Sequence, residues 1–311
     1  MIDIATYLIR ATILITVGIV LANIALETNI LNRLSTLVVP LSKTLNLPKA
    51  SVFSLLTSFL SPTAGKSVLS EFYKDGDVSD REAIVTVVMS TFPVVFSESL
   101  LRAQAPIALI LLGPRIGGIY IALRLLSSFL QSFAAFIYSR FFLPGVNFLE
   151  DEKKYDLKEI DRDPPCIKTA LKRSFRTLKR VIPILIITFI VIFILSDYGV
   201  MDQVALFFEP ILKSLGIPGE SATALIAQFI HYSAGYATVA LLLVEGVLTE
   251  KQAIITLLIG SMLGITMMYL RYSLSMYLSL FGRFGLKMVA INYSSSMIAK
   301  VIMILLVTVA M

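Results

Sequence analysis

Two short interruptions of an apolar sequence carry side chains that could bind a polar solute. The first is SPTAGKS, residues 61–67, and the second is HYSAGY, residues 231–236. Hydroxyl groups both donate and accept hydrogen bonds, glycine permits a close backbone turn, and lysine or histidine adds charge. The binding candidates in these stretches are Ser61, Thr63, Gly65, Lys66, His231, Ser233 and Gly235.

Both charged candidates also have a structural alternative. Lys66 could extend its ammonium group to the membrane surface, and His231, the only histidine, could be an ordinary hydrogen-bonding side chain. A single histidine without cysteines or paired carboxylates nearby makes a poor metal site. The GKS triplet at residues 65–67 is not a phosphate-binding loop, because that loop needs a glycine where Leu60 stands.

A third group of candidates lies in FPVVFSESLLRAQAP, residues 92–106. Glu98 and Arg102 are four residues apart, so on a helix they share a face and can pair. Ionisable side chains inside a membrane are expensive and usually functional, and we therefore expect Glu98 to hold a coupling proton or a cation. The alternative is a structural ion pair with Arg102. Ser97 and Arg271, which aligns with Arg102 in the second half of the chain, complete the candidate set.

The composition excludes several classes of protein. Of the 311 residues, 57% are hydrophobic and 15% are charged, and the mean hydropathy is +0.84; this is typical of a polytopic helical membrane protein. The basic residues concentrate at 153–180, but seven acids at 150–163 accompany them, which argues against nucleic-acid binding. Cys166 is the only cysteine. No Ser-His-Asp set or HExxH motif appears, so we expect no enzyme, no cofactor and no bound metal.

An internal duplication organises the chain. Between residues 40 and 86, 13 of 47 positions are identical to the residue 170 positions later, including paired prolines and glycines. Such a repeat, with about five apolar membrane segments in each half, predicts residues 1–145 as one repeat, 146–176 as a cytoplasmic linker and 177–311 as the second repeat.

The charges of equivalent loops predict the orientation of the two repeats. Residues 27–49 carry three basic side chains and one acid, whereas residues 197–220 carry four acids and one lysine. Because Lys and Arg prefer cytoplasmic loops, this reversal places the loops on opposite sides. We therefore expect an all-α integral membrane protein of two inverted-topology repeats, with broken or re-entrant helices at the two interruptions.

The stretches SPTAGKSVLSEFYKDGDVSDREA and YSAGYATVALLLVEGVLTEKQA resemble the nucleoside-recognition, or Gate, domain family. In each, a break with glycine precedes an apolar helix, a short turn with glycine and an S/T-x-x-x-A sequence. The family includes spore-maturation membrane proteins, and similar domains occur in ferrous-iron transporters and, more distantly, in concentrative nucleoside transporters. The resemblance implies a paired-gate membrane protein with the break residues near the pathway. Ferrous-iron transporters carry a cysteine in the gate, and the aligned stretches here carry none.

These features together predict a multi-pass cell-membrane transporter that moves a small polar solute or ion by alternating access between two inverted repeats. A nucleoside-like solute is one alternative among several. The expected partners are the lipid bilayer and that solute, with no nucleic acid; a homo-oligomer remains an open alternative. The second reading is a non-transporting membrane scaffold of the spore-maturation type.

Overall fold

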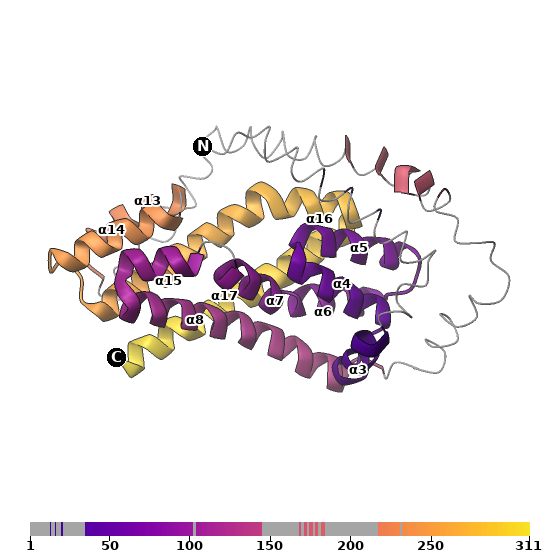
Figure 1. The fold of residues 1–311 in the computed structure, drawn as a ribbon, viewed down its shortest axis with the longest axis horizontal. Coiled ribbons are helices and arrows are strands. Elements are labelled where there is room, and N and C mark those ends of the chain that lie inside the picture. The colour runs from indigo at the N-terminus through magenta and orange to yellow at the C-terminus, as the bar shows by residue number, and fades with distance from the viewer. Residues whose placement is uncertain are drawn as a thin grey trace. The chain divides into compact units, whose positions relative to one another are not determined.

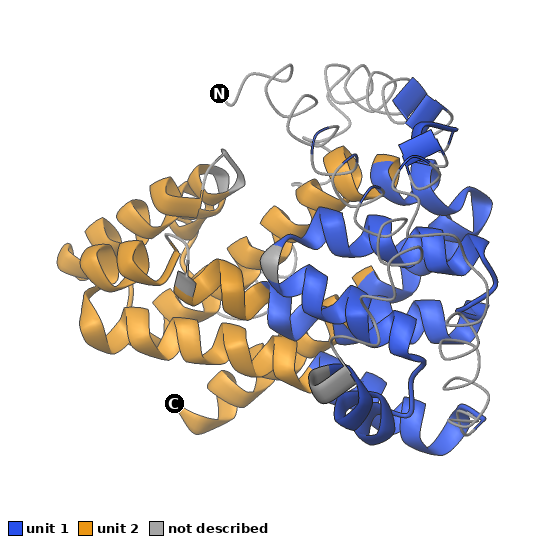
Figure 2. Cartoon of the chain, turned by 45° about the vertical axis from the view of Figure 1, so that its right-hand side comes forward, with its two compact units in different colours: residues 1–94, 131–186, 276–292 blue, residues 95–130, 187–275, 293–311 orange. Residues whose placement is uncertain are grey.

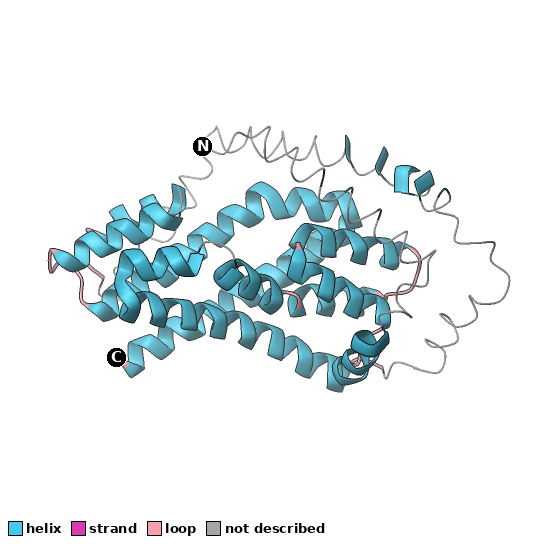
Figure 3. Ribbon diagram, in the orientation of Figure 1, coloured by secondary structure: helices cyan, strands magenta, loops and turns pink. Residues whose placement is uncertain are grey.

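A computed structural model describes residues 35–101, 104–144, 217–230 and 232–311, with scattered positions at 13–20 and 168–183. Over these residues every regular element is a helix and no strand occurs (Figure 3). Four helical stretches are long and apolar enough to cross a membrane: Asp80–Leu100, Gln104–Phe142, Glu250–Phe281 and Arg283–Ala310. The expectation of an all-α membrane protein is thereby confirmed.

The first interruption forms the tip of a helical hairpin. Helix α4 (Lys49–Leu60) ends and helix α5 (Pro62–Lys74) begins on either side of Ser61, whose backbone is extended at φ −149° and ψ 115° (Figure 1). The Ser61 hydroxyl accepts a hydrogen bond from the Ala64 N–H at 3.3 Å, and Pro62 starts α5 where its missing N–H costs nothing. Local sequence therefore dictates both the break and the new helix.

The second interruption repeats this hairpin at an offset of 170 residues. Helix α13 (Ser221–Ile230) and helix α14 (Tyr232–Val244) end and begin at the positions equivalent to those of α4 and α5. Residue His231, at the second tip, lies outside the described residues. The arms of the expected hairpins are thus present at matching places in both repeats.

Close packing next to each tip requires glycine. Gly65 lies within α5, not in the turn expected from the sequence, and a Cβ atom there would come 2.7 Å from the Cα atom of Ser58 on α4. A Cβ atom on Gly235 of α14 would come equally close, 2.7 Å, to the Cα atom of Gln228 on α13. Each contact joins the third residue before the tip to the fourth residue after it, so the arms lie side by side.

The chain leaves each hairpin through an equivalent turn and enters a capped helix. Gly76 and Gly246 have φ angles of 76° and 72°, a left-handed conformation that favours glycine. Helix α6 (Asp80–Met89) and helix α15 (Glu250–Met268) then begin with capping boxes, Ser79 with Glu82 and Thr249 with Gln252. The duplication is therefore visible in backbone conformation as well as in sequence.

A side chain from a distant helix repairs a helix interruption near Pro93. Helix α6 gives way at Ser90 to helix α7 (Thr91–Phe96) and a π-helical turn η1 (Ser97–Leu101). Pro93 has no N–H for the Met89 carbonyl, and the Ser132 hydroxyl donates to that carbonyl at 2.9 Å while it accepts from the Phe92 N–H at 3.0 Å. Backbone groups in a membrane need such internal partners.

Glycines also divide the remaining long helices at equivalent points. Helix α8 (Gln104–Phe142) is kinked at Gly113, where φ is 78°. In the second repeat, α15 continues through a π-helical turn η3 (Tyr269–Ser273) into helix α16 (Leu274–Phe281), and Gly282, with φ 62°, separates α16 from helix α17 (Arg283–Ala310).

The helices group into two compact units that draw on both halves of the chain (Figure 2). Unit 1 comprises residues 1–94, 131–186 and 276–292, and unit 2 comprises residues 95–130, 187–275 and 293–311. The first hairpin thus shares its unit with the end of α8 and the start of α17, whereas the second hairpin shares its unit with the start of α8 and the end of α17. The boundaries of the sequence repeats, at 145 and 177, remain a prediction.

Replacing Gly65 or Gly235 with alanine is expected to destabilise the protein by about 1–3 kcal/mol, because the added methyl group must displace a helix backbone. Thermal unfolding of the purified protein in detergent, followed by circular dichroism, measures the effect. Gly118→Ala in α8 and Gly264→Ala in α15 are matched controls, since a Cβ atom at either position meets nothing within 4 Å. Equal behaviour of all four variants would contradict the close packing of the hairpins.

Candidate functional site

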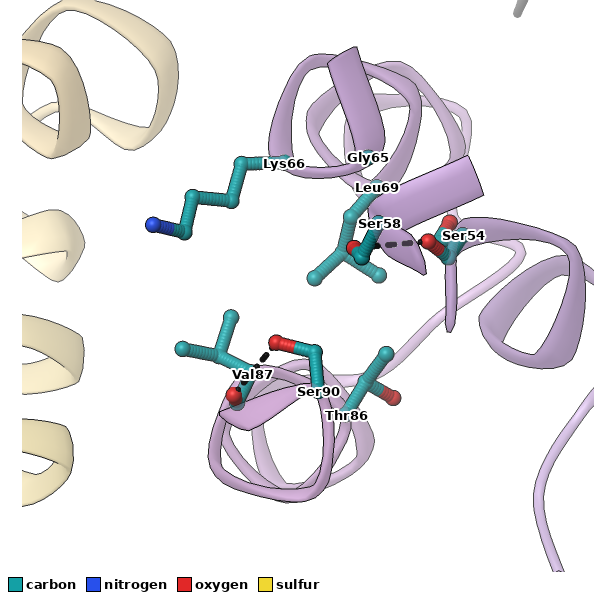
Figure 4. Close-up of a pocket in the computed structure, with 8 residues that line it drawn as sticks. All are labelled: Ser54, Ser58, Gly65, Lys66, Leu69, Thr86, Val87 and Ser90. Atoms are coloured by element: carbon teal, nitrogen blue, oxygen red, sulfur yellow. Dashed lines mark hydrogen bonds between the residues drawn. The ribbon is translucent and has the colours of Figure 1, made fainter. Parts of the chain in front are cut away.

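Unit 1 contains a small pocket beside the first hairpin. It is lined by Ser54, Ser58, Gly65, Lys66, Leu69, Thr86, Val87 and Ser90, from α4, α5 and α6 (Figure 4). The space between these side chains does not admit a water molecule, so the pocket is closed in the structure.

The hydroxyls around the pocket already use their protons within their own helices. Ser58 donates to the Ser54 carbonyl at 2.8 Å, and Ser90 donates to the Val87 carbonyl at 2.7 Å (Figure 4). A hydroxyl that donates in this way keeps its oxygen lone pairs for another group. The pocket therefore offers hydrogen-bond acceptors, which suit a solute with N–H or O–H groups or a cation.

Lys66 is the one charged side chain that lines this pocket. Its chain extends away from Ser54 and Ser58 (Figure 4), and its Nζ atom lies 5.0 Å from the centre of the Tyr277 ring on α16. A cation over an aromatic face is stabilised by the ring quadrupole. This contact directs the half-buried Lys66 side chain toward α16, and both its binding role and its alternative at the membrane surface remain predictions.

The other candidates of the first interruption lie at the hairpin tip. Ser61 caps α5, and Thr63 follows in its first turn; both are half-buried. The Thr63 carbonyl accepts a hydrogen bond from Ser67 at 2.9 Å. These two residues thus shape the start of α5, and among the candidates from the sequence only Gly65 and Lys66 line the pocket.

The remaining candidates belong to unit 2 or lie outside the described residues. Ser233 and Gly235 are in the first turn of α14, half-buried and buried. Ser97 is buried and Glu98 is half-buried in the π-helical turn η1, whereas Arg271 in η3 is exposed. Arg102 and His231 lie outside the described residues, so the expected pairing of Glu98 with Arg102 and the role of His231 remain predictions.

A buried amide joins three helices of unit 1. The Asn292 side-chain oxygen on α17 accepts hydrogen bonds from Gln131 on α8 at 3.0 Å and from Thr91 on α7 at 3.3 Å. Gln131 also donates to the Asn292 backbone carbonyl at 3.2 Å. Hydrogen bonds between membrane helices contribute roughly 0.6–2 kcal/mol each, so Asn292 helps to fix the helices that flank the α6–α7 interruption.

Four polar residues of unit 2 form a cluster that the sequence analysis did not select. The Tyr236 hydroxyl on α14 donates a hydrogen bond to the Tyr120 hydroxyl on α8 at 3.3 Å, and both tyrosines and Lys300 on α17 interact electrostatically with Arg124 on α8. Arg124 and Lys300 interrupt the apolar stretches IYIALRLLSSF and MIAKVIMILL. The rule that intramembrane charges are functional candidates, applied to Glu98, would have selected them too.

Tyr236 is the repeat equivalent of Lys66, because their positions differ by 170. Each follows the close-packed glycine of its hairpin, and each meets an aromatic ring on a helix of the other repeat: Lys66 meets Tyr277 and Tyr236 meets Tyr120, with ring centres 5.4 Å apart. At the same position of the repeat, the first hairpin therefore carries an ammonium group and the second carries a phenol. In the described part of the chain, no three His, Cys, Asp or Glu residues gather as metal ligands.

These observations define the class of protein: a multi-pass helical membrane protein with two repeats, each of which carries a helical hairpin. Residues 8–103 and 178–284, one segment from each repeat, match the Gate family, described as nucleoside recognition, and the chain belongs to this family. The match to both segments confirms the expected pair of Gate-like repeats. The family assignment indicates a role related to membrane transport.

The chain is similar along its whole length to proteins of Methanocaldococcus jannaschii. It is 42% identical to Uncharacterized protein MJ0880 over 98% of both chains. It is 27% identical to Uncharacterized protein MJ0871 over 96% of this chain and 93% of the relative. Uncharacterized protein MJ1556 is 26% identical over 89% of this chain and 86% of the relative. No solved structure matches the chain significantly.

Asn292→Ala is expected to lower the free energy of unfolding by about 1–3 kcal/mol, because Gln131 and Thr91 lose a buried acceptor. Unfolding in detergent, monitored by circular dichroism, measures the loss. Ser294→Ala, at an exposed position two residues further along α17, is the control and should be near neutral. An Asn292→Ala variant as stable as the control would show that this network does not hold the helices.

Proposed function

We propose that the protein is a transporter, and not an enzyme, that moves a small polar solute across the cell membrane by alternating access. The observation that carries this proposal is the pair of equivalent hairpins whose tips interrupt the helices at Ser61 and at the position 170 residues later. Inverted repeats with broken helices in matching places are the arrangement from which secondary transporters build their binding sites.

The lengths of the hairpin arms support re-entrant segments. Helices α4 and α5 have 12 and 13 residues, and at about 1.5 Å per residue each arm is roughly 18–20 Å long. The hydrocarbon core of a bilayer is about 30 Å thick. An arm of this length cannot cross it alone, so we infer that each hairpin enters and leaves the membrane from one side, with its tip inside.

The pocket beside the first hairpin supplies groups for a solute. The lone pairs of Ser58 and Ser90 can accept hydrogen bonds from a polar solute, and the ammonium group of Lys66 can donate to an acceptor on it. Nucleosides are the first class to test, since the family is described by nucleoside recognition. The narrowness of the pocket corresponds, in this proposal, to a closed state of the gate.

A membrane scaffold is the second candidate, and the same narrowness favours it. The two functions differ in one measurable result, uptake by purified protein in liposomes. We expect time-dependent uptake of at least one of radiolabelled uridine, adenosine, hypoxanthine and lactate above that of empty liposomes. Lys66→Ala should reduce that uptake at least about tenfold, whereas Lys43→Ala, at an exposed position of helix α3 (Ser35–Leu45), should not. No uptake of any of these solutes would favour the scaffold.

The inverted orientation of the repeats can be measured without knowing the solute. Asp75 and Glu245 are equivalent, exposed loop residues after the two hairpins, and Cys166→Ser removes the only native thiol. In that background we expect Asp75→Cys to react with a membrane-impermeant maleimide in intact cells. Glu245→Cys should react only after permeabilisation, because an inverted repeat places its loop on the cytoplasmic side.

Labelling of both cysteines from the same side would show that the two repeats are parallel. The wild-type protein, with Cys166 in the basic linker, is the control for a cytoplasmic thiol. Measurement of the free thiols after denaturation confirms that each introduced cysteine is chemically intact.

A further inference from the structure

The two repeats fill the space between their hairpin and the helix that follows it in different ways. In unit 1 this space is the pocket between α4, α5 and α6. In unit 2 the equivalent space, between α13, α14 and α15, contains the side chain of Gln228, the residue 170 positions after Ser58. Gln228 is only 5% exposed, so its carboxamide is buried between the second hairpin and α15.

Gln228 joins the second hairpin to α15. Its Nε2 group donates a hydrogen bond to the Leu257 carbonyl of α15 at 3.3 Å. Two glycines leave room for this side chain. A Cβ atom on Gly235 of α14 would lie 2.7 Å from the Gln228 Cα atom, and a Cβ atom on Gly260 of α15 would overlap the Gln228 side-chain oxygen. The second hairpin is therefore attached to α15 by close packing and by a hydrogen bond.

The equivalent carbonyl in unit 1 has a partner within its own helix. Val87 lies 170 positions before Leu257, and its carbonyl accepts a hydrogen bond from Ser90 at 2.7 Å (Figure 4). Ser90 stands where the second repeat has Gly260, so its Cβ atom corresponds to the space that the Gln228 oxygen fills in unit 2. The second repeat thus bonds this carbonyl from the hairpin, and the first repeat bonds it from the same helix.

The four hydroxyls that line the pocket of unit 1 all donate within their own helices. Ser54 and Ser58 donate to carbonyls four residues earlier in α4. Thr86 and Ser90 donate to carbonyls four and three residues earlier in α6. A hydroxyl has one proton to donate, so none of these four donates from α4 to α6. At the pocket, the first hairpin and α6 therefore meet without the hydrogen bond that Gln228 forms in unit 2.

We propose that the first hairpin is the moving gate of the transporter and that Gln228 holds the second hairpin on α15. This inference rests on the proposed function and deepens it, because it assigns the opening step of alternating access to α4 and α5. Separation of α4 from α6 opens the pocket and leaves the bonds of its four hydroxyls intact. Separation of α13 from α15 breaks the Gln228 bond and leaves an amide and a carbonyl without partners, which is costly inside a membrane.

The test measures the opening of each hairpin without a solute. In the Cys166→Ser background, Ser54→Cys and Ala224→Cys introduce thiols at equivalent positions of α4 and α13, which are 1% and 0% exposed in the structure. Thiols buried to this extent react with methyl methanethiosulfonate when the surrounding structure opens locally. In purified full-length protein we expect the thiol at position 54 to react at least about tenfold faster, after each rate is divided by that of the unfolded chain. Equal rates would overturn the proposal.

The role of the Gln228 bond is measured in the Ala224→Cys protein. Gln228→Met removes the donor with little change in volume, and it should raise the reaction rate about 3- to 30-fold, the range that corresponds to the loss of one hydrogen bond between membrane helices. Thr256→Val removes a hydrogen bond within α15 itself and should leave the rate unchanged. A Gln228→Met protein as slow as its parent, or an equal rise in Thr256→Val, would refute the role of the Gln228 bond.

The bond can also be transferred to the first repeat. Ser58→Gln combined with Ser90→Gly gives the first hairpin and α6 the residues of the second repeat. In the Ser54→Cys protein this pair should slow the thiol reaction about 3- to 30-fold. Ser58→Gln alone is the control and should not slow it, because the Ser90 Cβ atom stands in the place of the amide oxygen. A double variant with a native circular dichroism spectrum that reacts as fast as its parent would contradict the proposal.

Uptake in liposomes separates this inference from the proposed transport function. The Ser58→Gln, Ser90→Gly protein should take up any transported solute at least about threefold more slowly than the wild type. Uptake by the wild type together with equal thiol rates at positions 54 and 224 would support transport and refute the assignment of the gate. A fast thiol at position 54 alone, without uptake of any solute, would support the moving hairpin and count against transport.

Discussion

Two helices that meet at a one-residue break can lie side by side only if no side chain separates them beside the break. Gly65 and Gly235 satisfy this condition, because each faces the backbone of the opposite hairpin arm. The next residue along a helix is rotated by about 100°, so Lys66 and Tyr236 point away from their own hairpins toward neighbouring helices. The close packing of the hairpin arms thus determines the direction in which Lys66 and Tyr236 point.

The first hairpin and the α6–α7 interruption illustrate how a membrane helix can be broken at low cost. Ser61 caps the new helix with its own side chain, and Ser132 donates to the Met89 carbonyl that Pro93 leaves without its helical partner. In a medium without water, such replacements are needed at every break. These hydrogen bonds explain why serine residues occur within otherwise apolar helices.

The duplication preserved the backbone of the two repeats but not their side-chain chemistry. Equivalent glycines adopt the same left-handed conformations and equivalent capping boxes start the same helices. The side chains at equivalent positions differ. Lys66 corresponds to Tyr236, 170 positions later, and Gln131, which binds Asn292, corresponds to Lys300, 169 positions later, the separation that also relates Arg102 to Arg271. Unit 1 consequently exposes hydrogen-bond acceptors around a small pocket, whereas unit 2 gathers donors and positive charge.

Local features of the chain were predictable from the sequence. The breaks at residue 61 and 170 residues later, the helical membrane class and the duplication follow from proline, glycine and apolar runs, because these act over a few neighbouring residues. Gly65 was misread as a turn residue, since its need for space arises from a second helix. Only tertiary packing brings Arg124 near Lys300, which is 176 positions away, and divides α8 and α17 between the two units. Residues so far apart along the chain show no pattern in the sequence that would predict their contact.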